Sequence, residues 1–355
     1  MIPGIQKLKI DSQLNPDYTF TNYIEGDCNR LARSAGMAIS KRPGTSAFNP
    51  LLIYSSVGLG KTHLAHAVGN EVKVLYPEKQ VLYVTSEQFT NQFIDSMRNN
   101  AHNDFTNFYS QIDLLIVDDI QFLANKTKTQ DIFFFIFNTL HQNGKQLILT
   151  SDRPPKDLEG IEDRLISRFK WGLSADLQVP SLETRLAIIQ QKMQQDGVEI
   201  PHQVAEYISY SVRTNIRELE GILISIIAES ALNQRDIDIN LAHEVISKFV
   251  HDISEEISVE FVQKIVADYY KLQIQDLKEK TRTKLIVVAR QLSMYLSKTI
   301  CGKSLSEIGR AFGGRDHTTV LHACRSVEEM LQTDPAFKYA ADDIKAKIKV
   351  MLPPD

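Results

Sequence analysis

The loop that follows the apolar run Leu51–Tyr54 constrains the fold of this chain more than any other segment. It reads Ser-Ser-Val-Gly-Leu-Gly-Lys-Thr-His, from Ser55 to His63. A loop of this composition can direct backbone N–H groups at phosphate oxygens, while its lysine reaches the outer phosphates and its hydroxyl reaches Mg²⁺. Such a loop follows a strand and begins a helix, so the sequence predicts strand, phosphate-binding loop and helix in that order.

The predicted ligands of this loop are ATP or ADP together with Mg²⁺. The loop residues expected to bind the nucleotide are Gly58, Gly60, Lys61, Thr62 and His63, with Thr62 also at the metal. Ser55 stands where the usual motif begins with glycine, and serine adopts some of the backbone angles open to glycine only at a cost. The alternative is a strand, turn and helix that carry Gly-Lys-Thr by chance.

A second apolar run, Leu114–Val117, ends in Asp118 and Asp119. Carboxylates at the end of a buried strand can place one group at the metal and the other at the attacking water. We therefore assign Asp118 to the metal and Asp119 to water activation. The same pattern also fits a strand end that caps a helix, and it is the combination with Gly-Lys-Thr that favours a nucleotide site.

Three further polar residues are candidates for sensing the nucleotide. Asp152 follows the apolar run Leu147–Thr150 and could sense the γ-phosphate. Arg164 and Arg168 lie one helical turn apart, and Arg168 could point into the nucleotide of a neighbouring subunit. Arg217 lies just inside a capped helix and could reach the γ-phosphate. Arginines at such positions also form ordinary ion pairs, and the sequence leaves both interpretations open.

Short apolar runs alternate with helical stretches up to residue 180, which predicts an α/β fold with a parallel sheet covered on both faces. From residue 181 the pattern is wholly helical, and Asn215-x-x-Glu218 marks the start of one helix. The predicted strands are Leu51–Tyr54, Val81–Thr85, Leu114–Val117 and Leu147–Thr150. The predicted domains are an arm at 1–14, a nucleotide-binding core at 15–180, a helical lid at 181–252 and an all-α domain at 253–355.

The charge of the chain is unevenly distributed. Its formal net charge is −4, yet residues 278–325 contain ten Lys or Arg against three acidic residues, a local excess of +7. Such an excess is the electrostatic footprint of a domain that binds nucleic-acid phosphates. Within it, the basic loop that contains Arg282 and Lys284 suits the DNA backbone or the minor groove. The alternative is a helical bundle with a solvated basic face.

The basic segment also carries the pattern of a helix-turn-helix. Leu305, Ile308 and Phe312 have helical spacing, Gly313-Gly314 breaks the helix, and a second helix follows. The second helix of such a motif enters the major groove by its N-terminal end. The residues expected there to bind bases or phosphates are Arg315, Asp316, His317, Thr318 and Thr319. The residues expected on its buried face are Val320, Ala323, Cys324 and Val327.

Together these motifs resemble the AAA+ core and the DNA-binding signature of the DnaA family. The resemblance extends from about residue 15 to the C-terminus, and its most specific motif is Ile308–Cys324. The other matching motifs are residues 15–20, 58–63, 118–122, 150–153 and 215–221. The resemblance implies an AAA+ P-loop parallel sheet with a helical lid, followed by an all-α helix-turn-helix domain that binds DNA.

The same resemblance implies an ATP-dependent initiator of chromosomal replication. Such a protein binds DnaA-box duplex DNA, forms a filament in its ATP form and melts the adjacent origin. In this chain Asp119 would support slow hydrolysis, Asp152 would be a sensor, and Arg217 a second sensor. Arg168 would be an arginine finger that acts between subunits. The family also responds to acidic phospholipids.

Further implied roles concern assembly and DNA. The segment Glu87–Asn100 resembles the family's initiator-specific helical element, which steers the ATP form into the filament. Lys126 and Lys128 fall where the filament grips single-stranded DNA. Arg282 would enter the minor groove of the DnaA box. The residues that would contact bases and phosphates are Arg290, Gln291, Asp316, His317, Thr318 and Thr319.

Two other functions compete with the initiator. An AAA+ motor or helicase loader is disfavoured, because motors usually carry glutamate where Asp119 stands and a loader would not need residues 257–355. We therefore expect a weak ATPase that acts as a nucleotide switch. A shortened paralogue that binds boxes without opening the origin is the other alternative, since the family's N-terminal partner domain has no counterpart in residues 1–14. Helicase recruitment is in doubt for the same reason.

The sequence also suggests where the protein resides. Its three cysteines, Cys28, Cys301 and Cys324, are far apart and form no metal-binding or disulfide pattern. It contains no apolar run of the roughly 20 residues that a membrane helix needs, and no secretory signal is visible. These features predict a reducing, cytoplasmic compartment, and the family resemblance implies a nucleoid-associated bacterial protein.

Overall fold

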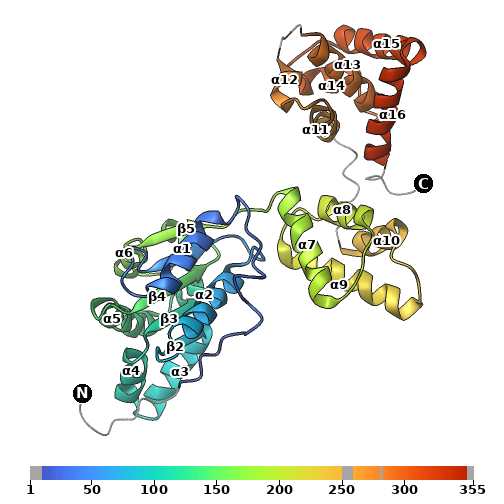
Figure 1. Ribbon diagram of the computed structural model, residues 1–355. Helices are drawn as coiled ribbons and strands as arrows, with labels where there is room; N and C mark the ends of the chain where they lie inside the picture. The colour runs from blue at the N-terminus through green and yellow to red at the C-terminus, as the bar shows by residue number, and fades with distance from the viewer. Residues whose placement is uncertain (1–9, 250–258, 280, 282, 350–355) are drawn as a thin grey trace. The chain divides into compact units, whose positions relative to one another are not determined.

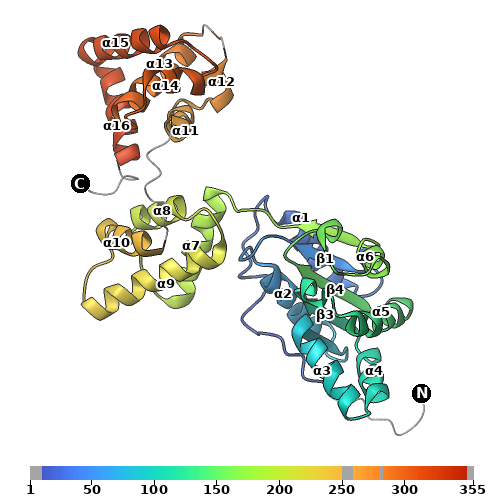
Figure 2. The same cartoon turned by 180° about the vertical axis from the view of Figure 1, so that it is seen from behind.

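The computed structural model describes residues 10–249, 259–279, 281 and 283–349, and Figures 1 and 2 show it from two sides. The chain divides into two compact units. The first unit comprises Met1–Glu199 and Val212–Gly221, and the second comprises Ile200–Ser211 and Ile222–Asp355. No helix within the described residues has the length and apolar composition needed to cross a membrane.

The first unit is built on a parallel five-stranded sheet with the strand order β2-β3-β4-β1-β5. Its strands are β1 (Leu51–Tyr54), β2 (Val81–Thr85), β3 (Leu114–Asp118), β4 (Gln146–Ser151) and β5 (Leu173–Asp176). Strand β3 is buried along its whole length, as expected where both faces of a parallel sheet are covered. The predicted α/β fold and the four predicted strands are confirmed. The sequence does not predict β5, because this edge strand reads Leu-Ser-Ala-Asp and only one of its residues is fully buried.

Alternate residues of the strands pack on opposite faces of the sheet. Leu115 and Val117 join one apolar cluster, whereas Leu114 and Ile116 join another. The first cluster includes residues of α3 (Ser86–Arg98), α4 (His102–Ser110), α5 (Thr127–Gln142) and α6 (Asp163–Phe169). The second cluster includes residues of α1 (Arg30–Lys41) and α2 (Lys61–Leu75). The carboxyl ends of the parallel strands meet at one edge, where the loops after β1, β3 and β4 come together.

Two helical segments complete the first unit, α7 (Leu182–Asp196) and the start of α9 (Ile216–Asn233). Asn215 caps α9 as predicted, because its Oδ1 accepts a hydrogen bond from the Glu218 N–H at 2.7 Å. The Glu218 carboxylate accepts from the Thr214 hydroxyl. The first compact unit extends past residue 180 and includes α7, so the predicted domain boundary at 180 stays a prediction. The predicted boundary at 252 lies outside the described residues.

The second unit is helical. Its helices are α8 (His202–Ser211), the rest of α9, α10 (Ile239–Phe249), α11 (Val259–Tyr270), α12 (Ile274–Lys278), α13 (Lys284–Thr299), α14 (Leu305–Ala311), α15 (His317–Thr333) and α16 (Pro335–Lys349). Helices α14 and α15 form the predicted helix-turn-helix, with Ile308 and Phe312 fully buried. The predicted inner face of α15 is confirmed, since Val320, Ala323, Cys324 and Val327 are all buried.

The turn between α14 and α15 depends on glycine. Gly313 and Gly314 have φ angles of 84° and 73°, a region that L side chains rarely adopt. Gly309 is needed for a different reason: the Arg315 N–H donates to its carbonyl at 2.8 Å, and a Cβ at Gly309 would lie 2.1 Å from the Arg315 carbonyl oxygen. The turn before α15 therefore packs its backbone directly against that of α14 at Gly309.

The substitution Gly309→Ala is expected to destabilise the second unit by about 1–3 kcal/mol, because backbone rather than a side chain must move to admit the methyl group. Urea unfolding of the full chain, followed by circular dichroism, measures this loss. Gly221→Ala is the matched control, since a Cβ at that helical position meets no atom within 4 Å. An unfolding midpoint of Gly309→Ala equal to that of the wild type would contradict the close packing of the turn.

Candidate nucleotide site and DNA interface

The phosphate-binding loop connects β1 to α2 and owes its shape to two glycines. Gly58 and Gly60 have φ angles of 79° and 93°, and a Cβ at Gly58 would lie 2.8 Å from the Asn215 side chain. Ser55, by contrast, does not have a positive φ. The strain expected of serine at the first loop position is therefore absent, because this position does not need the angles that only glycine adopts readily.

Lys61 begins α2 and directs its amine back into the loop. The Nζ atom donates hydrogen bonds to the carbonyl oxygens of Ser55 and Ser56, at 3.0 and 3.1 Å. Burial lowers the pKa of Lys61, and the nearby Asp119 and Asp118 carboxylates oppose that shift. The loop thus holds a cation at its centre, in the position from which a lysine reaches nucleotide phosphates.

Thr62 and Asp118 meet as the sequence predicts. The Thr62 hydroxyl donates to Asp118 Oδ2 at 2.9 Å, and the Tyr83 hydroxyl donates to the same oxygen at 2.7 Å. The Thr150 hydroxyl donates to the other oxygen of Asp118. Nothing in the sequence singles out Tyr83, which reaches Asp118 because β2 and β3 are neighbours in the sheet.

A hydroxyl beside a carboxylate is a donor set that suits Mg²⁺, which is held by few carboxylates and by substrate phosphates. No group of three or more His, Cys, Asp or Glu residues in the described part of the chain could hold a metal ion. The Thr62 hydroxyl and the Asp118 carboxylate fit a magnesium ion that is bound together with a nucleotide.

Asp119 and Asp152 also lie at this edge of the sheet. Asp119 has a φ of 56° and its Oδ1 accepts from the Gln121 side chain at 3.0 Å. Burial raises its pKa, and the neighbouring Asp118 charge adds to the effect. Asp152 pairs with Arg153 at 2.8 Å, and this hydrogen bond lowers the pKa of Asp152. Both carboxylates line the same cavity as Lys61 and Thr62.

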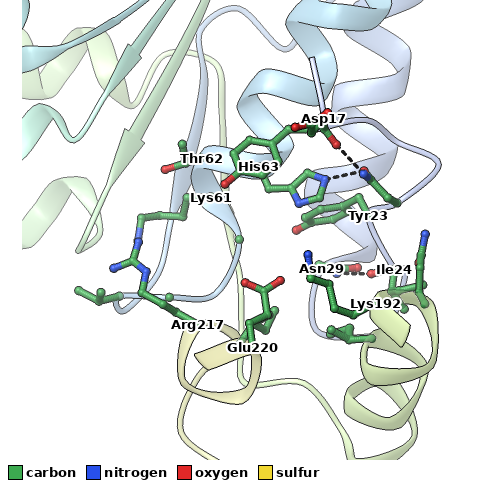
Figure 3. A pocket seen from close by; sticks show the side chains of 18 of the residues that line it. Asp17, Tyr23, Ile24, Asn29, Lys61, Thr62, His63, Lys192, Arg217 and Glu220 are labelled. Carbon is green, nitrogen blue, oxygen red and sulfur yellow. Dashed lines mark hydrogen bonds between the residues drawn. The ribbon is translucent and has the colours of Figure 1, made fainter. Parts of the chain in front are cut away.

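The loop opens into this cavity, which has a volume of about 430 Å³ and lies within the first unit. Figure 3 shows Lys61, Thr62 and Arg217 toward one end of the cavity and Tyr23, Ile24 and Asn29 toward the other. Arg217 comes from α9 and is exposed, and no residue in the described ranges forms an ion pair or hydrogen bond with it. Its guanidinium is thus available to an anion in the cavity.

His63 lines the cavity but is engaged with the N-terminal segment. Its ring stacks on Tyr18 with centroids 4.7 Å apart, and its Nε2 lies 3.0 Å from the Asn22 side-chain oxygen and 3.2 Å from the Thr19 carbonyl. Burial lowers the pKa of His63, so the neutral ring is favoured. These contacts hold residues 18–22 against α2, and Tyr18 and Asn22 line the cavity.

The two arginines of α6 have different surroundings. Arg164 pairs with Glu162 at 2.6 Å and with Asp131. Arg168 lies over the ring of Trp171, 4.7 Å from its centroid, and has no carboxylate partner among the residues that the structure describes. It does not line the cavity of its own chain. The predicted single-strand residues Lys126 and Lys128 lie at the start of α5.

Arg290 has a role that differs from the predicted contact with DNA. Its side chain is only 7% exposed and donates hydrogen bonds to four carbonyl oxygens, those of Asp276, Leu277, Glu279 and Thr281, at 2.7–3.2 Å. Because most donors of this guanidinium are bonded to backbone carbonyls, Arg290 anchors the end of α12 and the loop between α12 and α13. Arg282, which was also predicted to contact DNA, lies outside the described residues.

The start of α15 presents polar groups to solvent. Asp316 is the N-cap: its Oδ1 accepts from the Thr319 N–H at 2.9 Å and from the hydroxyls of Thr318 and Thr319. These hydrogen bonds lower the pKa of Asp316 to about 2. His317, Thr318 and Thr319 are exposed, while Arg315 donates to the Glu279 carbonyl at 2.8 Å. Gln291 and Arg315 line a second cavity beside these residues, and Lys284 is exposed at the start of α13.

The fold and the sites define a P-loop nucleotide-binding protein of the AAA+ class that also carries a helix-turn-helix. The family described as "Bacterial DnaA ATPAse domain" matches residues 14–176, and "Bacterial dnaA protein helix-turn-helix" matches residues 259–327. The chain is 53% identical over 350 residues to the chromosomal replication initiator protein DnaA of Flavobacterium psychrophilum, covering 99% of this chain and 73% of the relative.

Solved structures give the same result. AMPPCP-bound DnaA from Aquifex aeolicus is 36% identical and superposes with a TM-score of 0.59, over 95% of this chain and 100% of the other. A replication initiator DnaA bound to AMPPCP and single-stranded DNA is also 36% identical, with a TM-score of 0.58 over 95% of this chain and 98% of the other. The chain belongs to the DnaA family of bacterial chromosomal replication initiators.

The substitution Arg290→Lys is expected to weaken binding to a DnaA-box duplex roughly tenfold, because an ammonium cannot satisfy four carbonyls at once and the loop loses its anchor. Fluorescence anisotropy with a labelled duplex measures the binding, and urea unfolding measures the accompanying loss of stability. Arg310→Lys, at an exposed position on α14, is the control. Weaker binding with unchanged stability would instead support direct contact between Arg290 and DNA.

Proposed function

We propose that this chain is an ATP-controlled initiator that assembles on DnaA-box DNA and opens the adjacent duplex. The observation that carries this proposal is the presence in one chain of two groups of residues, each suited to one ligand. One is a cavity that joins Lys61, Thr62 and Asp119 to the guanidinium of Arg217, which forms no hydrogen bond or ion pair within the described ranges. The other is a helix-turn-helix whose second helix begins with exposed polar groups.

ATP is the ligand that this cavity suits, because the loop supplies backbone donors and a lysine for phosphates. Thr62 and Asp118 would hold Mg²⁺, which neutralises phosphate charge when bound. The AMPPCP bound to the similar DnaA from Aquifex aeolicus supports an adenine nucleotide as the ligand. Arg217 would bind the γ-phosphate, so its contact would be lost in the ADP form. Asp152 would sense the same phosphate after exchanging its bond with Arg153.

Asp119 would orient the water that attacks the γ-phosphate. Burial keeps the pKa of this carboxylate above its usual range, which makes it a better proton acceptor than an ordinary aspartate. Its side chain is one methylene shorter than the glutamate of AAA+ motors and is already bonded to Gln121. These features support slow hydrolysis, which suits a switch better than a motor.

Assembly would use groups on the surface of the first unit. Arg168 has no carboxylate partner in the described part of its own chain, so its charge is available to the nucleotide of a neighbouring subunit. Lys126 and Lys128 would bind single-stranded DNA, a ligand that one similar DnaA structure contains. Binding of acidic phospholipids stays a prediction from the family resemblance.

The substitution Lys61→Ala is expected to weaken ATP binding by roughly ten- to 150-fold or more and to leave single-box binding intact, because the loss of a charge-assisted contact costs roughly 1.5–3 kcal/mol or more. Footprinting on origin DNA with ATP, ADP and no nucleotide measures the consequence: extended protection should require ATP in the wild type and never occur in the variant. Lys73→Ala is the control, since Lys73 is exposed on the same helix and does not line the cavity. Protection of the wild type without regard to nucleotide would disprove the switch.

The substitution His317→Ala is expected to weaken box binding by roughly 1–3 kcal/mol if the imidazole contacts a base. His317 is exposed at the first turn of α15, so its removal should leave the unfolding midpoint unchanged. Anisotropy titrations with a box duplex and with a scrambled duplex separate base from phosphate contact. An equal loss on both duplexes would place His317 at the phosphates.

A further inference from the structure

Glu220 places a carboxylate in the cavity that is proposed to receive a triphosphate. It lies on α9 one turn after Arg217 and is half-buried. Burial raises the pKa of Glu220, while attraction to Lys192 and Arg217 lowers it. Like charges repel at short range, and Glu220, unlike Asp118, accepts no hydrogen bond from a neighbouring hydroxyl within the described residues, so a part of the ligand that carries hydrogen-bond donors suits this side chain better than the phosphates.

The Glu220 carboxylate has no hydrogen-bond or ion-pair partner among the residues that the structure describes. Lys192, the nearest cation on α7, pairs with Asp196 at 3.7 Å instead. Glu218, two residues away on the same helix, accepts from the Thr214 hydroxyl and does not line the cavity. A half-buried carboxylate that faces a cavity without a protein donor is suited to accept hydrogen bonds from a ligand.

The position of Glu220 along the cavity identifies which part of the ligand it faces. Figure 3 shows its carboxylate between the phosphate-binding end, with Lys61 and Arg217, and the opposite end, with Ile24 and Asn29. A nucleotide with its phosphates at Lys61 extends toward Asn29, so its sugar lies between the two ends. Sugar hydroxyls are donors, and acidic residues accept from them in other nucleotide-binding folds.

We propose that Glu220 is a specificity-determining residue that accepts hydrogen bonds from the ribose hydroxyls and so selects ribonucleotides over deoxyribonucleotides. The proposal rests on the proposed function, since it requires that the cavity bind ATP or ADP. The ribose is common to both nucleotides, so the contribution of Glu220 should be equal in the two states of the switch. Arg217, in contrast, would respond to the third phosphate.

Two other roles for Glu220 give different results with nucleotide analogues. If the carboxylate only held Arg217 in place, its removal would weaken ATP binding more than ADP binding. If it accepted from the adenine amino group, its removal would abolish the preference for ATP over ITP, which lacks that group. Recognition of the ribose predicts instead that the preference for ATP over deoxy analogues depends on Glu220.

The experiment measures equilibrium binding of ATP, ADP, 2′-deoxyATP, 3′-deoxyATP and ITP by the full chain, with Mg²⁺ present throughout. The proteins compared are the wild type, Glu220→Gln, Glu220→Ala and the control Glu218→Gln, with the unfolding midpoint of each as a test of folding. The wild type and the control should bind ATP about ten- to a hundredfold more tightly than at least one deoxy analogue. This preference should fall to within about twofold in Glu220→Ala and to an intermediate value in Glu220→Gln. ATP and ADP should lose affinity by the same factor.

Three results would overturn the proposal. The first is a preference for ATP over both deoxy analogues that Glu220→Ala retains in full. The second is a loss of affinity confined to ATP, which would assign Glu220 to the placement of Arg217. The third is a loss of the preference over ITP with the ribose preference unchanged. A wild-type chain that binds no adenine nucleotide would overturn the proposed function itself, and this outcome is distinct from the other three.

Discussion

The hydrogen bond from the Thr62 hydroxyl to the Asp118 carboxylate joins the phosphate-binding loop to the centre of the sheet. Asp118 is buried, so its charge requires donors, and it receives them also from Tyr83 of β2 and Thr150 of β4. Four segments distant in sequence thus meet at one carboxylate. The strand order β2-β3-β4 makes this meeting possible, and the loop, the cavity and the proposed metal position all depend on it.

A buried charge has a comparable role in the second unit. Arg290 satisfies two carbonyls of α12 and two of the loop that follows it, and Arg315 donates to the Glu279 carbonyl in the same loop. This loop and the start of α15 are therefore held by one set of hydrogen bonds. The excess of positive charge in residues 278–325 thus includes cations that shape the DNA-binding surface as well as cations that could contact DNA.

Local patterns predicted much of the fold. The four apolar runs are strands, the glycine turn separates α14 from α15, and Asn215 caps α9, because each depends on residues within a few positions of one another. Strand β5 escaped prediction, since its pairing with β1 outweighs a half-polar sequence. The strain expected at Ser55 is absent, because the φ angle at that position depends on the folded loop rather than on the motif.

The sequence by itself determined the phosphate-binding loop, the paired carboxylates after β3 and the helix-turn-helix, because their chemistry is encoded in contiguous residues. Only the tertiary structure decided which side chains complete the sites. Tyr83 reaches Asp118 across a strand pair, Arg290 turns inward to a loop, and Glu220 enters the cavity one turn after Arg217. Such roles depend on which segments become neighbours when apolar strands and helices are buried, and no local pattern of residues encodes that.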